Sequence, residues 1–229
     1  MKIGLFGGTF DPIHLGHIEA ASAARRALEL DRVLLLTSRT PPHRATEPRA
    51  SAFHRFAMAA LAAAEYDMMV SDLELRREGP SYTALTLEAL HRDGFSPSQL
   101  YFITGSDAFA EVDTWYAYPR VLELANFVIV SRPGSPRPSD LTPASARLQY
   151  PRDGARRSAR RRRPHPKSPI PGGEPTMYSV ETSTPNVSST DIRHRIAAGE
   201  SIEGLVPPAV ADHIRRHGLY VPAHVAAAL

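Results

Sequence analysis

Short, continuous apolar runs alternate along the chain with longer segments rich in alanine and leucine. The short runs lack the in–out alternation of a sheet with one solvated face, and are typical of strands buried on both sides. We predict strands at 2–6, 32–38, 100–104, 127–131 and 177–182, and a strand or extended stretch at 68–75. The segments between them contain strong helix formers. We predict helices at 15–30, 51–65, 83–92, 190–198 and 208–217, and a helix end at 121–125.

This alternation of strand and helix predicts an α/β fold, with a parallel sheet covered by helices on both faces. The region 133–175 breaks the pattern, because it holds ten of the 21 prolines, the run Arg160–Arg163 and the pair Gly172-Gly173. Such a composition disfavours a packed core. We therefore expect one domain over residues 1–229, with a mobile, basic, proline-rich insertion at about 135–175.

Composition narrows the class of protein further. The 229 residues include no cysteine, which excludes a disulfide framework, a thiolate metal site and a cysteine nucleophile. The longest apolar stretch, 56–64, is far shorter than the ~20 residues of a membrane span. The first residues carry no apolar leader with a small-residue cleavage site. We expect a cytoplasmic protein without a membrane partner.

The net charge of +3 is unevenly distributed. Residues 152–167 hold eight of the 27 basic residues and one of the 24 acidic ones, so the rest of the chain carries a net charge of −4. No aromatic residue lies within this basic segment to stack on bases. The pattern therefore favours a solvated linker over a nucleic-acid-binding segment. Binding of nucleic acid through the arginine run remains the alternative from another functional class, and deletion of 152–167 would discriminate between them.

The first candidate for chemistry is the string Gly-Gly-Thr-Phe-Asp-Pro-Ile-His-Leu-Gly-His at 7–17, between a predicted strand and a predicted helix. Gly7 and Gly8 allow close approach of the backbone to a ligand, and the start of a helix attracts anions. His14 and His17 share one helical face, so both can donate to one phosphate. Neither the dinucleotide-binding nor the P-loop glycine pattern occurs in the chain. An ordinary turn with two surface histidines and a two-histidine metal site are the alternatives.

A second candidate is the string Val-Ser-Ser-Thr-Asp-Ile-Arg at 187–193. The hydroxyls of Ser188, Ser189 and Thr190 stand at a predicted helix start, where they can donate to phosphate oxygens. Arg193 can clamp two such oxygens. The alternative is a simple helix cap with a solvated arginine.

Together the two strings resemble the T/H-x-G-H and I-S-S-T-x-I-R motifs of the nucleotidyltransferase superfamily, whose fold is Rossmann-like. Three further strings occur in matching order: Thr-Pro-Pro-His-Arg at 40–44, Gly-Pro-Ser-Tyr-Thr at 79–83, and Gly-Ser-Asp at 105–107 followed by Trp-Tyr at 115–116. Their order and spacing are similar to those of the bacterial nicotinate-nucleotide adenylyltransferase family. The likeness covers about 1–134 and 177–219. The segment after 134 is richer in proline and arginine than that family's pattern.

The resemblance implies transfer of AMP from ATP to nicotinate mononucleotide with Mg²⁺, giving nicotinate adenine dinucleotide and pyrophosphate in NAD biosynthesis. It implies that His14 and His17 are catalytic. ATP would be bound by the first loop, a strand end and the second motif, namely Gly7, Gly8, Thr9, Phe10, Gly105, Asp107, Ser188, Ser189, Thr190 and Arg193. Nicotinate mononucleotide would be bound by His43, Arg44, Thr83, Trp115, Tyr116 and Arg132.

Some of these roles also follow from residue chemistry. Asp107 follows a strand, at the end where open α/β sheets bind ligands, and can accept from ribose hydroxyls; a helix-capping role is the alternative. Trp115, the one tryptophan, suits stacking on a pyridine ring, and would otherwise be core or rim. His43, Arg44 and Arg132 are candidates for the phosphate of the mononucleotide, and a solvated loop is the alternative for His43 and Arg44.

Other acceptors would use the same two motifs. Adenylyl transfer to nicotinamide mononucleotide or phosphopantetheine, and cytidylyl transfer to a small phosphate, therefore remain alternatives, as does a non-catalytic nucleotide-binding module. The sequence is compatible with either a monomer or a homo-oligomer.

Overall fold

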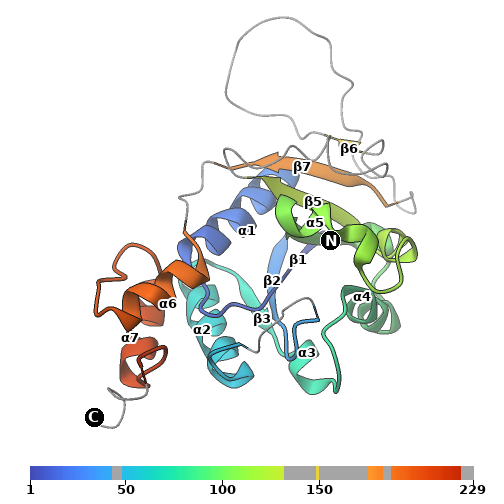
Figure 1. Ribbon diagram of the computed structural model, residues 1–229. Coiled ribbons are helices and arrows are strands. Elements are labelled where there is room, and N and C mark those ends of the chain that lie inside the picture. The colour runs from blue at the N-terminus through green and yellow to red at the C-terminus, as the bar shows by residue number, and fades with distance from the viewer. Residues whose placement is uncertain (43–47, 132–147, 150–174, 183–186, 223–229) are drawn as a thin grey trace, which may run out of the picture. The chain divides into compact units, whose positions relative to one another are not determined.

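The computed structural model describes residues 1–42, 48–131, 148–149, 175–182 and 187–222 (Figure 1). The predicted insertion at about 135–175 lies outside the described residues, apart from a short strand at Leu148–Gln149 and the single residue 175. His43, Arg44 and Arg132 also lie outside them.

Within the described residues, seven strands form a sheet in the order β3-β2-β1-β4-β5-β7-β6. The strands are β1 (Ile3–Gly8), β2 (Arg32–Thr37), β3 (Met69–Ser71), β4 (Leu100–Gly105), β5 (Asn126–Ser131), β6 (Leu148–Gln149) and β7 (Met177–Glu181). The pairs β2·β3, β4·β5, β5·β7 and β6·β7 are all parallel. The predicted α/β fold with a parallel sheet is confirmed.

Seven α-helices accompany these strands in the described residues: α1 (Leu15–Leu28), α2 (Ala52–Glu65), α3 (Leu73–Arg76), α4 (Thr83–Arg92), α5 (Ser106–Ala110), α6 (Ser189–Ala197) and α7 (Pro208–Arg216). The predicted helices are confirmed, with ends shifted by one or two residues. Local chemistry explains several starts. The Ser51 hydroxyl accepts from the main-chain N–H of His54 at 3.3 Å, and Pro208 occupies the first position of α7.

Two predicted elements differ from the structure. The stretch 68–75 contains a strand of only three residues, and the four-residue helix α3 follows it. Helix formers in Leu73–Arg76, together with the Arg76–Asp72 ion pair of 2.8 Å, account for this turn to helix. The helix end expected at 121–125 is a 3₁₀ turn, Arg120–Glu123.

The chain divides into two compact units. Unit 1 comprises Met1–Leu5, Ala20–Val33 and Thr83–Ser183, and unit 2 comprises Phe6–Glu19, Leu34–Tyr82 and Thr184–Leu229. In unit 1, the buried side chains of β4 and β5 lie at the centre of the core, and Figure 1 shows β5 beside β7. In unit 2, the core includes Phe10, Ile13, Leu35 and Met58.

No helix within the described residues has both the length and the apolar character needed to cross a membrane.

Candidate active site

The two histidines of the first motif form a reciprocal cap at the start of α1. The main-chain N–H of His14 donates to Nδ1 of His17 at 3.2 Å, and the main-chain N–H of His17 donates to Nδ1 of His14 at 3.3 Å. Their rings stack with centroids 3.7 Å apart. The arrangement is that of a capping box, in which the residue before the helix and the third helical residue each satisfy the other's N–H.

This cap determines where each imidazole carries its hydrogen. A ring nitrogen that accepts a main-chain N–H has no hydrogen of its own, so the neutral ring of His14 or His17 carries its hydrogen on Nε2. Both residues therefore hold an Nε2–H donor close to the positive end of α1. Two oriented donors at a helix N-terminus are suited to a phosphate group.

Aromatic rings from β1 and from the loop before α1 pack against His17. Phe10 is buried, has a positive φ of 51°, and places its ring edge-to-face with His17 at a centroid distance of 5.2 Å. The ring of Phe6 packs at a tilt against the same imidazole, with centroids 6.0 Å apart. A Cβ on Gly8 would stand 2.5 Å from the Phe10 ring, so only glycine fits at that position.

Side chains of the second motif fasten it to the first. Arg193 donates through Nη1 to the carbonyl oxygen of Asp11 at 2.7 Å and through Nη2 to Oγ1 of Thr190 at 3.0 Å. The Ser189 hydroxyl donates to the carbonyl oxygen of Pro12 at 2.9 Å. The structure thus brings together, within unit 2, two motifs that lie about 175 residues apart along the chain.

The serines of the second motif use their hydroxyl hydrogens within the protein. Ser188 is the N-cap of α6, where its oxygen accepts from the main-chain N–H of Asp191 at 3.1 Å and its hydrogen goes to the Asp191 carboxylate at 2.7 Å. Ser189 gives its hydrogen to Pro12. The donors that suit an anion here are the guanidinium of Arg193, which uses two of its five N–H groups in the bonds above, and the first main-chain N–H groups of α6.

A buried carboxylate that sequence analysis missed orders this region. Asp11 is fully buried, and its oxygens accept from the main-chain N–H groups of Arg49 and Ala50 at 2.9 and 3.0 Å. The hydroxyl of Tyr220 donates to Asp11 Oδ1 at 2.9 Å. Burial, and then the negative charge of Asp11, raise the pKa of Tyr220 and keep it a donor. The chain gives no local signal for the Tyr220 contact, because 209 positions separate the two residues.

A buried arginine on α2 is a second residue that was missed. Arg55 donates to the carbonyl oxygens of Thr9 and Ser38, both at 2.7 Å, and to those of Arg39 and Ala50 at 3.1 and 3.2 Å. The sequence pattern indicated that Arg55 is buried, because it lies on the same helical face as Met58, Ala59, Ala62 and Ala63. A charged residue on an apolar stripe predicts a buried polar network.

Two of the strings noted in the sequence also meet inside unit 2. The main-chain N–H of Arg39 donates to the Ser81 hydroxyl at 2.9 Å, and the main-chain N–H of Ser81 donates to the carbonyl oxygen of Thr40 at 2.9 Å. The segment after β2 is therefore joined to the Gly-Pro-Ser-Tyr string. His43 and Arg44, the next candidates along the first of these strings, lie outside the described residues.

Unit 1 carries the other candidate residues. Asp107 is exposed in the first turn of α5, and a Cβ on Gly105 would collide with its carboxylate oxygen. Trp115 is half-buried, with its ring 6.1 Å from Phe102 and 6.3 Å from Phe127. Tyr116 beside it is 51% exposed.

The remaining candidate of unit 1 is Thr83, which begins α4 and is half-buried. Arg132 lies outside the described residues, directly after β5.

Known proteins resemble the chain over nearly all of its length. A family model described as cytidylyltransferase-like matches residues 5–195. A Thermus thermophilus protein named "Probable nicotinate-nucleotide adenylyltransferase" is 42% identical over 221 residues, covering 96% of this chain and 100% of that protein. A Syntrophotalea carbinolica protein of the same name is 38% identical over 223 residues, covering 96% and 97%.

A solved structure shares the fold. Nicotinic acid mononucleotide adenylyltransferase of Plasmodium falciparum, complexed with NaAD, has a TM-score of 0.66 at 16% identity, covering 96% of this chain and 97% of that one. At this identity the likeness shows the fold alone. From the family model and the close relatives, the chain belongs to the cytidylyltransferase-like family and, within it, to the nicotinate-nucleotide adenylyltransferases.

Proposed function

We propose that this chain acts in the cytoplasm as an adenylyltransferase that moves AMP from ATP to nicotinate mononucleotide, giving nicotinate adenine dinucleotide and pyrophosphate for NAD biosynthesis. The observation that carries the proposal is the reciprocal cap of His14 and His17, which gives both rings an Nε2–H donor at the start of α1. Arg193, joined to the same loop through Asp11, adds a fixed positive charge in unit 2.

In the proposed reaction, an oxygen of the 5′-phosphate of the mononucleotide attacks the α-phosphorus of ATP. That bond forms as the bond from the α-phosphorus to the bridging oxygen breaks, and the electron pair leaves with pyrophosphate. The attacking phosphate is already an anion, so no strong general base is needed. Catalysis then consists of positioning and charge stabilisation. His14 and His17 donate to the α-phosphate, and Thr190 and Arg193 hold the leaving pyrophosphate.

We propose that Mg²⁺ enters with ATP as part of the substrate. The residues present fit a metal held mainly by phosphate oxygens and water, because both carboxylate oxygens of Asp11, the acid in the first motif, accept hydrogen bonds from the protein. The ion neutralises charge on the triphosphate when bound. This chain's own residues orient that triphosphate.

For the acceptor, we propose that the exposed part of Trp115 stacks on the pyridine ring. Thr83 and the main chain at Tyr116 would bind the ring carboxylate. His43, Arg44 and Arg132 would bind the mononucleotide phosphate, and Asp107, next to Gly105, would accept from the ATP ribose. The half-burial of Trp115 supports the stacking role, since packing on Phe102 and Phe127 fixes its ring while leaving part of it accessible.

The test is pyrophosphate release from Mg·ATP with nicotinate mononucleotide, nicotinamide mononucleotide and phosphopantetheine compared in parallel. We expect rapid turnover with the first acceptor and much slower turnover with the other two. Fast turnover only with another acceptor would overturn the acceptor assignment and leave the ATP site standing. Absence of turnover with all three would overturn the enzymatic proposal in favour of a nucleotide-binding module.

A matched pair of variants on α6 tests the ATP side. Arg193→Lys keeps a charge but loses the fork that reaches Asp11 and the pyrophosphate, so we expect kcat to fall by roughly 10²-fold. Arg195→Lys is the control, because Arg195 is exposed and pairs with Glu200 at 3.4 Å. Equal kcat in the two variants would remove Arg193 from the mechanism.

A further inference from the structure

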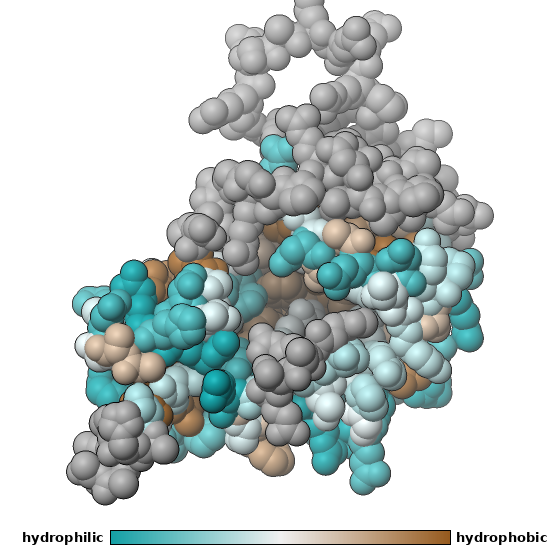
Figure 2. Space-filling model, viewed as in Figure 1, coloured by the Kyte–Doolittle hydropathy of each residue, from teal (hydrophilic) through white to brown (hydrophobic). Residues whose placement is uncertain are grey.

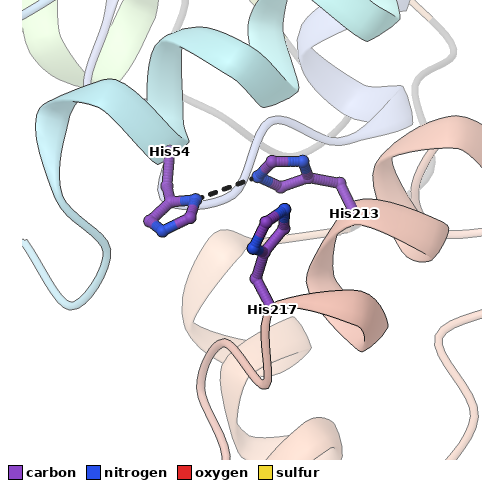
Figure 3. Close-up of side chains that lie close together, drawn as sticks. All are labelled: His54, His213 and His217. Carbon is purple, nitrogen blue, oxygen red and sulfur yellow. Dashed lines mark hydrogen bonds between the residues drawn. The ribbon is translucent and has the colours of Figure 1, made fainter.

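Three histidines of unit 2 that the proposed reaction does not use lie together where α2 contacts α7. Figure 3 shows His54 from α2 facing His213 and His217 from the end of α7. Each offers a ring nitrogen, and these three atoms lie within 4.8 Å of one another. Nδ1 of His54 and Nε2 of His213 share a hydrogen bond of 3.1 Å, so one of the two carries the hydrogen that a bound metal ion would replace. Two of the rings are half-buried and that of His217 is exposed.

The two helices hold these side chains in place. His213 and His217 are four positions apart, so they project from one face of the last turn of α7, with centroids 4.4 Å apart. His54 is the third residue of α2, where the Ser51 cap accepts its main-chain N–H. Its ring lies 5.3 Å from that of His213 and 4.9 Å from that of His217. The cluster is therefore built on helical backbone rather than on a loop.

The residue type suits a metal of the zinc type, because imidazole is among the commonest protein ligands for such ions. Neutral imidazole is the form that coordinates metals. The C-terminal end of α7 and the N-terminal end of α2 meet here, so the two helix dipoles oppose one another and the ring nitrogens are the groups that favour an ion.

We propose that His54, His213 and His217 form a binding site for one divalent transition-metal ion of the zinc type, which fastens α7 to α2. Tetrahedral zinc with Zn–N distances of about 2.0–2.1 Å places its ligand nitrogens about 3.3 Å from one another. The His54–His213 separation of 3.1 Å is already close to that value, and a side-chain rotation of the exposed His217 brings in the third ligand. The exposure of His217 leaves the fourth position to water.

This site differs in chemistry from the metal that accompanies ATP. Three imidazole nitrogens select zinc, nickel, cobalt or copper, whereas Mg²⁺ prefers oxygen ligands. None of the three histidines belongs to the motifs assigned to ATP or to the acceptor. On the face that Figure 2 shows, hydrophilic residues predominate around α6 and α7, and the ring of His217 is exposed to solvent. The proposal therefore does not depend on the proposed function.

The test uses the full-length chain without a histidine tag, stripped with a chelator and titrated with Zn²⁺ by calorimetry and with Co²⁺ by visible absorption. We expect one ion per chain and a cobalt spectrum of tetrahedral type. His213→Asn should weaken Zn²⁺ binding by on the order of 100-fold, because a three-ligand site loses a third of its coordination. The matched control is His194→Asn, which removes an exposed histidine of α6 and should leave the affinity unchanged.

A second measurement guards against misfolding of a variant. Zn²⁺ should raise Tm of the native chain and of His194→Asn, and should leave Tm of His217→Asn, altered at an exposed position, unchanged. Absence of Zn²⁺ binding by the native chain would overturn the proposal. So would binding that survives both His213→Asn and His217→Asn, because the ion would then be held elsewhere, for instance by His14 and His17.

Discussion

Unit 2 contains two groups of histidines, and they differ in what their ring nitrogens contact. His14 and His17 direct Nδ1 to main-chain N–H groups, so each holds its hydrogen on Nε2. His54 and His213 instead direct ring nitrogens toward one another. The first arrangement makes hydrogen-bond donors for an anion, and the second makes ligands for a cation. A sequence shows histidines at these positions but not which ring nitrogen carries the hydrogen.

At this scale we predict that His17→Ala lowers kcat by about 10²–10³-fold, the effect of removing one preorganised donor. The change also removes the acceptor for the His14 N–H, which is the loss of a helix cap and costs about 1 kcal/mol. The variant should therefore fold. Pyrophosphate release gives kcat, and urea unfolding gives stability. A variant with near-normal kcat would exclude His17 from the chemistry, and His194→Ala, outside the motif, should keep full activity.

Trp115→Ala should weaken binding of the acceptor, nicotinate mononucleotide, and leave ATP binding unchanged. The stacking of one ring on an aromatic side chain is worth about 1–3 kcal/mol, so we expect KM for nicotinate mononucleotide to rise at least about fivefold, with KM for ATP unchanged. Trp115→Phe should recover part of the loss, because a smaller ring can still pack on Phe102 and Phe127. Steady-state kinetics with each substrate varied in turn makes the measurement. An unchanged KM for the mononucleotide would contradict the stacking role.

At the scale of elements, local pattern determined most of what was predicted correctly. Apolar runs marked the strands, and helix formers with caps marked the helices, as in the Ser51 start of α2. The errors lie where an element is very short. β3 has three residues and α3 has four, so neither is long enough to repeat the period of its pattern twice. The short helix α5 after Gly105 was missed for the same reason.

The element that joins the loops of unit 2 is α2, through Arg55. Arg55→Lys places one ammonium where a planar guanidinium reaches four carbonyl oxygens, so some of them lose their donor. We expect the free energy of unfolding to fall by on the order of 2–3 kcal/mol, since hydrogen bonds to charged groups contribute about 1.5–3 kcal/mol each. We also expect kcat to fall, because Thr9 loses its anchor. Arg76→Lys is the control, on an exposed ion pair worth little. Equal unfolding free energies for the two variants would contradict the role of Arg55.

At the scale of the whole molecule, the sequence predicted which segments carry the motifs but not what joins them. The contacts of Arg193 with Asp11 and of Ser189 with Pro12 link positions more than 170 residues apart, and no local periodicity reports such pairs. The motifs themselves were predictable because their spacing is short. Asp11 lay inside a quoted string, yet its role depends on Tyr220, 209 residues away.

The Tyr220–Asp11 contact gives a prediction for the stability of the molecule at alkaline pH. Burial and the charge of Asp11 raise the pKa of Tyr220 above the value of about 10 expected in the unfolded chain. Below pH 10 both states keep the proton, and the contribution of Tyr220 to stability is fully present. As pH rises above 10, the unfolded state loses the proton while the folded state keeps it, so stability falls by up to about 1.4 kcal/mol per pH unit.

Tyr220→Phe should therefore have two opposite effects on unfolding by urea. At pH 8 it should be less stable than the native chain by about 1–3 kcal/mol, because buried Asp11 loses a donor. Between pH 10 and 11 the difference should shrink, since the variant no longer has this proton to lose. Tyr118→Phe, at a ring that is 36% exposed, should follow the native chain at every pH. If Tyr220→Phe lost stability with pH as steeply as the native chain, ionisation of the Tyr220 hydroxyl would not be the cause of the alkaline loss of stability.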